Sequence, residues 1–301
     1  MKQEETNKFG TIAILGEINV GKSTLLNKMI DEDISIVTHK ANTTREQVKG
    51  IKSDGNTQIV IIDTPGLASG VARIARSFLS QVWDAVMGAN FILIVIDSSK
   101  PASQTLYNLF DELKASTEKI PRAVLVMNKI DRCSKEDLLL KSKKINDCFP
   151  FQKTFMISSL KGYGVKDLIS WVSKNVPKKS WAYPPEKKHD MTMEKFLNEK
   201  TRETILLRVH QEVPYNLEVD THEIKELRDG SIRVGQFIKV QNARHRAMII
   251  GKLGQTIKAI SSRARHGIGK VLNKKVHLFF SPPNFSRLGL DCKAFTCLGS
   301  K

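Results

Sequence analysis

The chain has 301 residues, 41% of them hydrophobic, and carries a formal net charge of +17. This length fits about two domains, and the hydrophobic content suits packed cores. The sequence has no run of 18 apolar residues, which excludes a membrane-spanning helix. Residues 1–8 are polar and lack the apolar segment of a signal peptide, so we expect a cytoplasmic protein.

The cysteines do not suggest a metal site or a disulfide framework. No two of them form a Cys-x-x-Cys pair. We therefore expect reduced structural thiols. The four positions are Cys133, Cys148, Cys292 and Cys297.

The first half of the chain alternates short apolar runs with connections of helical length. The runs are residues 11–15, 58–62, 91–96, 123–127 and 154–157. This alternation predicts an α/β fold with a mainly parallel sheet covered by helices on both faces. Residues 48–53 and the turn Asp54-Gly55 predict a hairpin that adds one antiparallel edge strand.

The pattern G-x-x-x-x-G-K-[ST] follows the first apolar run and precedes a stretch compatible with a helix, residues 24–30. In such a loop, glycines let backbone N–H groups surround a polyphosphate, a lysine meets the outer phosphates and a serine hydroxyl holds Mg²⁺. The predicted phosphate loop and the residue after it are Gly16, Glu17, Ile18, Asn19, Val20, Gly21, Lys22, Ser23 and Thr24.

The segment Asp63-Thr64-Pro65-Gly66 directly follows the second apolar run. A carboxylate at this strand end would lie beside the phosphates, so we expect Asp63 to hold the metal through a water and the Gly66 N–H to face the terminal phosphate. The next residue is Leu67, which cannot orient a water, so slow intrinsic hydrolysis of the bound nucleotide is expected.

Guanine is indicated by Asn128-Lys129-Ile130-Asp131 at the end of run 123–127. Asp131 can accept two hydrogen bonds that guanine donates and adenine does not, and a buried carboxylate left unpaired is costly. We expect Asn128 to join this segment to the phosphate loop and Lys129 to lie over the base. The further predicted contacts, made to the guanine oxygen by backbone N–H groups, come from Ser158, Ser159 and Leu160.

Each of these short segments is also an ordinary surface turn when taken alone. Their shared order, spacing and positions at strand ends favour a GTP-binding domain over coincidence. We assign residues 9–176 to this domain.

The second half of the chain is the more basic half. Residues 181–301 contain 22 Lys+Arg and 12 Asp+Glu, and residues 230–290 contain 12 Lys+Arg and no acidic residue. A merely solvated surface would intersperse both signs, so a polyanionic partner is indicated. The segment 177–185 is typical of a stiff basic linker. The predicted boundaries are a linker at 177–190, a second domain at 191–281 and an unassigned tail at 282–301.

A Gly-x-x-Gly turn lies within this acid-free stretch and precedes a helical stripe of apolar residues that runs from Ile257 to Val271. Such a turn brings a nucleic-acid backbone to a helix N-terminus, where N–H groups and the helix dipole favour phosphate. Alone it is more often a simple turn. With the basic context and strand-like runs at 215–219 and 232–240, it predicts a small α+β KH domain of type II, which clamps about four nucleotides. The predicted RNA contacts are Gly251, Lys252, Leu253, Gly254 and Lys258.

These motifs, together with Asn42-Thr43-Thr44-Arg45, resemble the bacterial Era family of GTPases over residues 9–280. The resemblance implies binding of GTP, GDP and Mg²⁺ and a KH domain that binds the 3′ end of small-subunit ribosomal RNA. It also implies assistance in maturation of the 30S precursor and peripheral association with the inner membrane.

The resemblance also assigns roles to single residues. The switch threonine that holds Mg²⁺ corresponds to Thr43 or Thr44, with Thr44 favoured, and it would act beside Ser23 and Asp63. Asn19 stands where related GTPases ligate potassium, so K⁺ is a candidate cofactor. The residues expected to carry catalysis are Lys22, Thr44 and Gly66.

Three departures from the family pattern stand out. Glu17-Ile18 replaces the usual Arg-Pro, and Ser159 replaces the usual alanine. The terminal basic strand is cut short by Ser281-Pro282-Pro283, because two consecutive prolines cannot continue a central ladder. The first departure concerns the fine geometry of the phosphate loop.

The predicted function is an RNA-binding GTPase switch, monomeric and without a DNA partner. Two alternatives stay open from the sequence. One is a non-enzymatic RNA-binding assembly factor in which GTP is a structural ligand. The other is a GTPase directed to an anionic membrane or to transfer RNA.

Overall fold

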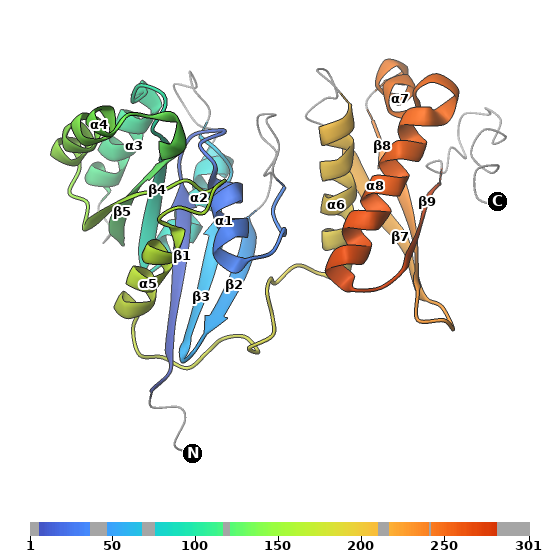
Figure 1. The fold of residues 1–301 in the computed structure, drawn as a ribbon, viewed down its shortest axis with the longest axis horizontal. Coiled ribbons are helices and arrows are strands. Elements are labelled where there is room, and N and C mark those ends of the chain that lie inside the picture. The colour runs from blue at the N-terminus through green and yellow to red at the C-terminus, as the bar shows by residue number, and fades with distance from the viewer. Residues whose placement is uncertain are drawn as a thin grey trace. The chain divides into compact units, whose positions relative to one another are not determined.

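The computed structural model describes residues 6–36, 47–67, 76–116, 121–209, 217–240 and 242–281. The chain divides into two compact units, residues 1–190 and 191–301, and each is described by itself (Figure 1). Several predictions fall outside the described residues, namely those on Thr43 and Thr44, on Cys292 and Cys297, and on the tail 282–301.

A six-stranded sheet forms the centre of the first unit, in the order β2-β3-β1-β4-β5-β6 (Figure 1). Strand β2 pairs antiparallel with β3, and the other neighbours pair parallel. The predicted hairpin and parallel strands are thus confirmed. The strands are β1 (Lys8–Leu15), β2 (Val48–Asp54), β3 (Thr57–Asp63), β4 (Phe91–Asp97), β5 (Arg122–Asn128) and β6 (Lys153–Met156).

Helices cover both faces of this sheet. Helices α2, α3 and α4 bury leucines, isoleucines and valines in one apolar core with the strands, while α1 and α5 pack against each other and against β3. The helices are α1 (Lys22–Ile30), α2 (Arg76–Met87), α3 (Gln104–Ala115), α4 (Lys135–Cys148) and α5 (Val165–Asn175), with a short 3₁₀ turn at Ile130–Arg132.

The central strands carry continuous apolar sequences because both of their faces are covered. Strand β3 is buried along its whole length, and β4 and β5 are buried at all but one position each. Since β1, β3 and β5 run in the same direction, their carboxyl ends meet at one edge. That edge receives the phosphate loop, Asp63 and Asn128.

The predicted linker 177–190 is hydrogen-bonded along the first unit. The side chain of Gln58, fully buried in β3, accepts from the N–H groups of Ala182 and Tyr183 at 3.1 and 3.0 Å and donates to Tyr183 O at 2.9 Å. The Gln58 amide also donates to Ser53 Oγ at 3.1 Å. This segment, which we call the strap, is therefore fixed at its middle by one buried amide.

The end of the strap lies on the open edge of β2. Ile51 N donates to Lys188 O at 2.7 Å, and Lys49 forms an ion pair with Asp190 at 3.4 Å. Gly50 and His189 form an antiparallel bridge. The strap thus continues the sheet beyond β2 before the second unit begins at Met191.

The second unit is a three-stranded sheet packed against helices. Its order is β7-β8-β9, with β7 antiparallel and β9 parallel to β8. Helices α6 and α8 bury Phe196, Ala264 and Ile268 against it. The elements are α6 (Met193–Arg208), β7 (Glu218–Glu226), β8 (Ile232–Lys239), α7 (Ala243–Ile250), α8 (Gln255–Leu272) and β9 (Val276–Ser281).

Two predictions about this unit need comment. The run predicted at 215–219 overlaps β7 only at Glu218 and Val219, and the strand continues to Glu226. The prediction missed this extension because Glu, Lys and Asp are poor strand formers. Strand β9 is described as far as Ser281, and the two prolines predicted to cut it short lie outside the described residues.

We predict that Gln58→Ala lowers the free energy of unfolding of the full chain by about 2–4 kcal/mol, since it leaves buried polar groups of the strap without partners. Urea unfolding would measure the change. Gln104→Ala is the matched control, because Gln104 is exposed on α3, and it should change stability by less than about 0.5 kcal/mol. Equal effects of the two variants would contradict the role given to Gln58.

Candidate nucleotide site and nucleic-acid loop

The side chain of Lys22 turns back onto its own phosphate loop. Its Nζ donates to Gly16 O at 3.0 Å and to Glu17 O at 2.8 Å, and the residue is 6% exposed. Burial lowers its pKa to about 8, although Asp63 and Glu17 favour the charged form. Phosphate oxygens are stronger acceptors for an ammonium than these carbonyl groups, so this lysine is placed to turn to a nucleotide.

Ser23 and Asp63 lie side by side as predicted. Ser23 Oγ donates to Asp63 Oδ2 at 2.6 Å, and Ser35 Oγ donates to the same oxygen at 3.0 Å. Hydroxyl and carboxylate oxygens are the hard donors that Mg²⁺ prefers, so Ser23 and Asp63 fit that ion. When bound, Mg²⁺ would neutralise charge on the phosphates. Ser35 carried no sequence signal and was missed.

The Asp-Thr-Pro-Gly segment is fastened to the phosphate loop. Thr64 Oγ1 donates to Ile14 O at 2.7 Å. Leu67 N donates to Gly16 O and Ile18 N donates to Leu67 O, both at 3.1 Å. The Leu67 side chain is 3% exposed and packs in the core, so it does not present any group to a water. Pro65 is buried between these anchors.

Asn128 joins its own segment to the phosphate loop, as predicted, and it also contacts the segment at Ser159. Its Nδ2 donates to Val20 O at 2.8 Å, and its Oδ1 accepts from Ser159 N at 2.9 Å. A Cβ at Gly21 would lie 2.3 Å from Asn128 Nδ2, and Gly21 has φ +100°. Glycine is therefore required here both by the close approach and by the backbone conformation.

Lys129 reaches back over the phosphate loop. Its Nζ donates to Asn19 O at 2.6 Å and to Asp97 Oδ2 at 2.7 Å. Burial raises the pKa of Asp97, but hydrogen bonds from Lys129 and Ser99 outweigh it and leave the pKa below its usual value. Asp97 thus stays ionised and holds the lysine in place, a role that the sequence did not reveal.

The base-recognition segment is only partly as predicted. A hydrogen bond with the Ser158 side chain lowers the pKa of Asp131, which is exposed and ionised. The backbone N–H of Ser158 donates to Tyr163 O, and that of Ser159 donates to Asn128. The prediction that both face the guanine oxygen is therefore not met in this structure, because internal acceptors hold them. Leu160 is 69% exposed beside them.

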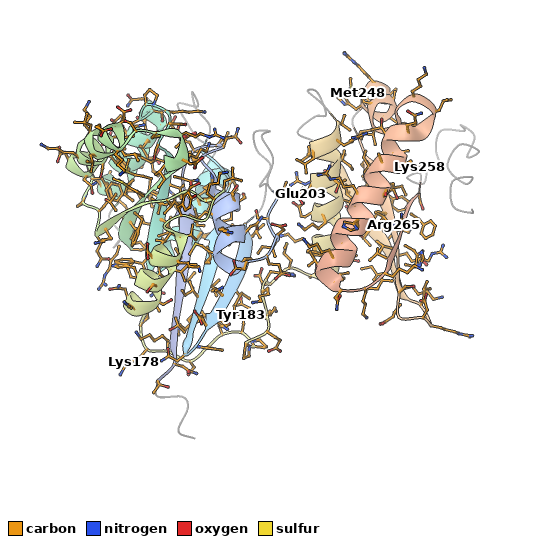
Figure 2. All side chains as sticks on the ribbon, in the orientation of Figure 1. Lys178, Tyr183, Glu203, Met248, Lys258 and Arg265 are labelled. Atoms are coloured by element: carbon orange, nitrogen blue, oxygen red, sulfur yellow. The ribbon has the colours of Figure 1, made fainter. Side chains whose placement is uncertain are left out.

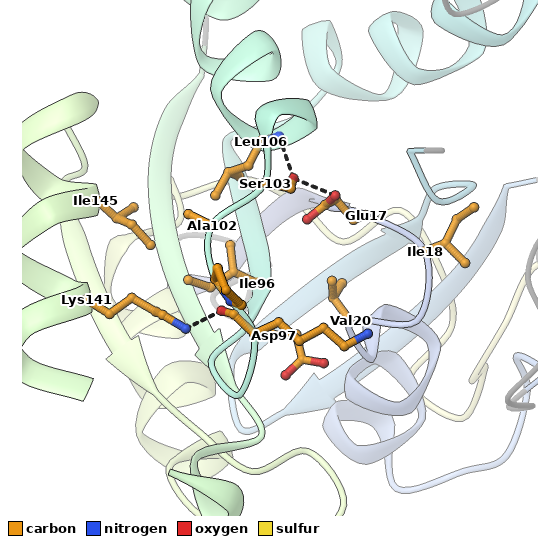
Figure 3. A pocket seen from close by; sticks show the side chains of 12 residues that line it. Glu17, Ile18, Val20, Ile96, Asp97, Ala102, Ser103, Leu106, Lys141 and Ile145 are labelled. Atoms are coloured by element: carbon orange, nitrogen blue, oxygen red, sulfur yellow. Dashed lines mark hydrogen bonds between the residues drawn. The ribbon is translucent and has the colours of Figure 1, made fainter. Parts of the chain in front are cut away.

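A cavity of about 200 Å³ adjoins the phosphate loop (Figure 3). Its walls are polar and apolar in nearly equal measure, with Val20, Ile96 and Leu106 among the apolar residues, and Lys141 stands at one side. Lys141 Nζ donates to the carbonyl oxygens of Ser98 and Lys100. This cavity lies between the loop and helices α3 and α4.

The Gly-x-x-Gly turn of the second unit connects α7 to α8. Gly251 has φ +72°, and a Cβ there would lie 2.0 Å from Thr256 Oγ1. Leu253 adopts φ +49° and is 90% exposed, an unfavourable backbone for leucine that presents its side chain to solvent. Lys252 is also exposed. The turn thus offers backbone, a cation and an apolar side chain together.

Helix α8 begins directly after this turn, and its charged residues point outward. Its buried positions, Ile260, Ala264 and Ile268, match the predicted stripe. Lys258 and Arg265 project from the helix in Figure 2 and are exposed, as is Arg263. The first turn of α8 contains no acidic residue. The helix N-terminus is therefore electropositive, as phosphate binding requires.

Comparison with known proteins decides the family. The model "50S ribosome-binding GTPase" matches residues 11–129, and a KH-domain model matches residues 212–281. GTPase Era of Dinoroseobacter shibae is 37% identical over 94% of this chain and 96% of its own, and that of Brucella suis is 38% identical over 94% of each. The chain belongs to the GTPase Era family.

Solved structures of Era agree with this assignment. Era in complex with MgGDPNP and nucleotides 1506–1542 of 16S ribosomal RNA has a TM-score of 0.84 and 29% identity, covering 92% of this chain and 93% of its own. An Aquifex aeolicus Era variant bound to GDP.AlF4⁻ has a TM-score of 0.82 and 30% identity, covering 91% and 93%. These matches confirm the fold predicted from the sequence, a P-loop GTPase domain followed by a KH domain.

Two kinds of feature are absent from the described residues. Within them, no helix is long and apolar enough to cross a membrane. The same residues contain no group of three or more His, Cys, Asp or Glu side chains placed to hold a metal ion. Cys133 and Cys148 are both free thiols and half-buried.

We predict that affinity for GTP falls as pH rises through about 8. Phosphate stabilises the ammonium of Lys22, so the pKa of Lys22 is higher in the nucleotide-bound protein than in the free protein. Above pH 8, roughly the pKa of Lys22 in the free protein, the lysine must therefore take up a proton when the nucleotide binds. Binding of a fluorescent GTP analogue between pH 7 and 9 should weaken by up to about tenfold per unit.

Lys22→Arg provides the control, because its guanidinium stays charged in this range. Deprotonation of guanine affects both proteins alike. A fall of the same size in the variant would show that Lys22 does not cause it.

Proposed function

We propose that this GTPase binds the 3′ end of small-subunit ribosomal RNA through its KH domain, in a manner set by the bound nucleotide, and assists maturation of the 30S subunit. The proposal is supported by the Era structure that contains nucleotides of 16S ribosomal RNA. It is also supported by the charge of residues 230–290, where no acidic residue opposes a phosphate backbone.

The observation that carries the proposal is the turn at Gly251–Gly254 on the N-terminus of α8. Its strained and exposed Leu253 and exposed Lys252 have no evident use within the fold. A single-stranded RNA backbone would approach the glycines of this turn closely and would meet its N–H groups and the Lys252 cation. The nucleotide acts in the first unit, where the γ-phosphate and its Mg²⁺ would engage the switch threonine.

We predict that Gly254→Asp weakens binding to a small-subunit rRNA 3′ end by at least about tenfold, because it places a bulky anion where phosphate lies. Fluorescence anisotropy would measure affinity with a GTP analogue, with GDP and without nucleotide, against a scrambled RNA. Gly230→Asp is the matched control. Gly230 also has positive φ, +78° against +74° for Gly254, and open space around it.

The outcomes separate the hypotheses. Preference for the rRNA end together with tighter binding in the GTP state supports the proposal. Binding that ignores both sequence and nucleotide would contradict it and would indicate a generic polyanion surface. Binding that depends on sequence alone would favour an assembly factor in which GTP is a structural ligand.

We also propose that K⁺ assists hydrolysis at Asn19. This residue is exposed on the phosphate loop with φ +63°, and Leu67 offers no group for orienting water. An additional cation at the phosphates would supply charge that the protein lacks.

Steady-state GTP turnover tests this cation proposal. Turnover should be several-fold faster in KCl than in NaCl at equal ionic strength, and Asn19→Ala should lose the difference. Equal turnover of the wild-type protein in both salts would rule the cation role out.

We propose that the protein acts in the cytoplasm and is a monomer. We also propose that it contacts the anionic face of the inner membrane. The excess of lysine and arginine in the second half supports attraction to such a surface. DNA is not proposed as a partner.

A further inference from the structure

The carboxylate of Glu17 points out of the phosphate loop toward helix α3 (Figure 3). Ser103 Oγ donates to Glu17 Oε1 at 2.6 Å and accepts from Leu106 N at 3.2 Å. Ser103 is the N-cap residue of α3. One hydroxyl therefore caps the helix and holds the loop at the same time.

Helix α3 gains an anion by this contact. It has twelve residues, and its first turn contains no acidic side chain of its own. The N-terminus of a helix carries partial positive charge and is stabilised by a nearby carboxylate. Glu17 occupies that position from another part of the chain.

The same contact keeps the negative charge of Glu17 away from the phosphates of the nucleotide. A carboxylate in a phosphate loop would repel the nucleotide if it faced the phosphates. Here the side chain faces α3, while the backbone oxygen of Glu17 accepts from Lys22. The negative charge is thus directed to the N-terminus of α3, which has no acidic side chain of its own in its first turn.

The loop is held on its opposite side by Leu67, through Gly16 O and Ile18 N. Leu67 directly follows Gly66 in the sequence, and the Gly66 N–H is expected to face the terminal phosphate. Helix α3, in contrast, is fixed by Leu106, Leu109 and Phe110 in the apolar core. Unlike the attachment to Leu67, the one to Ser103 need not change with the nucleotide.

We propose that Glu17 is a positioning residue for the nucleotide: through Ser103 it anchors the phosphate loop to α3 and holds the loop in the shape that retains GDP and GTP. The anchor is independent of RNA binding. Because the contact lies at the edge of the cavity beside the loop, water can partly replace it, and a moderate effect is expected.

A double-mutant cycle on GDP dissociation tests the anchor. The rate of release of fluorescent GDP is measured for the full chain and for Glu17→Ala, Ser103→Ala and the double variant. Each single variant should release GDP about tenfold faster, and the double variant no faster than either, because both lose the same contact. Independent effects, giving about a hundredfold in the double variant, would overturn the proposal.

Two further variants separate anchoring from helix capping. Ser134 caps α4 in the same way, accepting from Asp137 N at 3.1 Å, and Ser134→Ala should leave GDP release unchanged while lowering thermal stability as Ser103→Ala does. Glu17→Gln keeps an acceptor for Ser103 and should release GDP more slowly than Glu17→Ala. If GDP release were as fast from Ser134→Ala as from Ser103→Ala, loss of a helix cap alone would explain the effect. That result would refute the proposed anchor.

Discussion

The carboxamide of Asn128 is the contact on which the nucleotide site depends. It donates to the phosphate loop at Val20 and accepts from the base-recognition segment at Ser159, so one side chain sets the distance between the regions that bind the two ends of a nucleotide. It is 2% exposed, where an unmade hydrogen bond is costly. Gly21 has no side chain because this carboxamide occupies the space. Parallel strands deliver both partners to the same edge of the sheet.

Much of this arrangement could be predicted from sequence because the chemistry is local. The phosphate loop, Asp63 and Asn128 each follow an apolar strand, and parallel strands place such ends together. Helix α8 could be predicted since its apolar residues repeat with helical spacing. The preference of Asp131 for guanine over adenine likewise follows from hydrogen bonds that only guanine donates.

The rest depended on contacts between residues distant in the chain. Nothing in the sequence links Glu17 to Ser103, Lys129 to Asp97, or Gln58 to the strap, since each pair is brought together by the folded sheet. The acceptor of the Ser159 N–H, Asn128, was missed for the same reason, whereas the Ser158 N–H donates to Tyr163 within the same loop. Segment 177–190 has the composition of a linker, and composition carries no information on the buried amide that holds it.

The strap has a consequence for how this protein can be divided. An edge strand presents unpaired backbone groups that recruit other strands and promote aggregation. Here Lys188 covers the N–H of Ile51, and the strap occupies the acceptors and donors of Gln58. A GTPase domain cut at residue 176 would therefore expose both a sheet edge and a buried amide. We therefore expect a stable isolated GTPase domain to extend to Asp190, directly before the second unit.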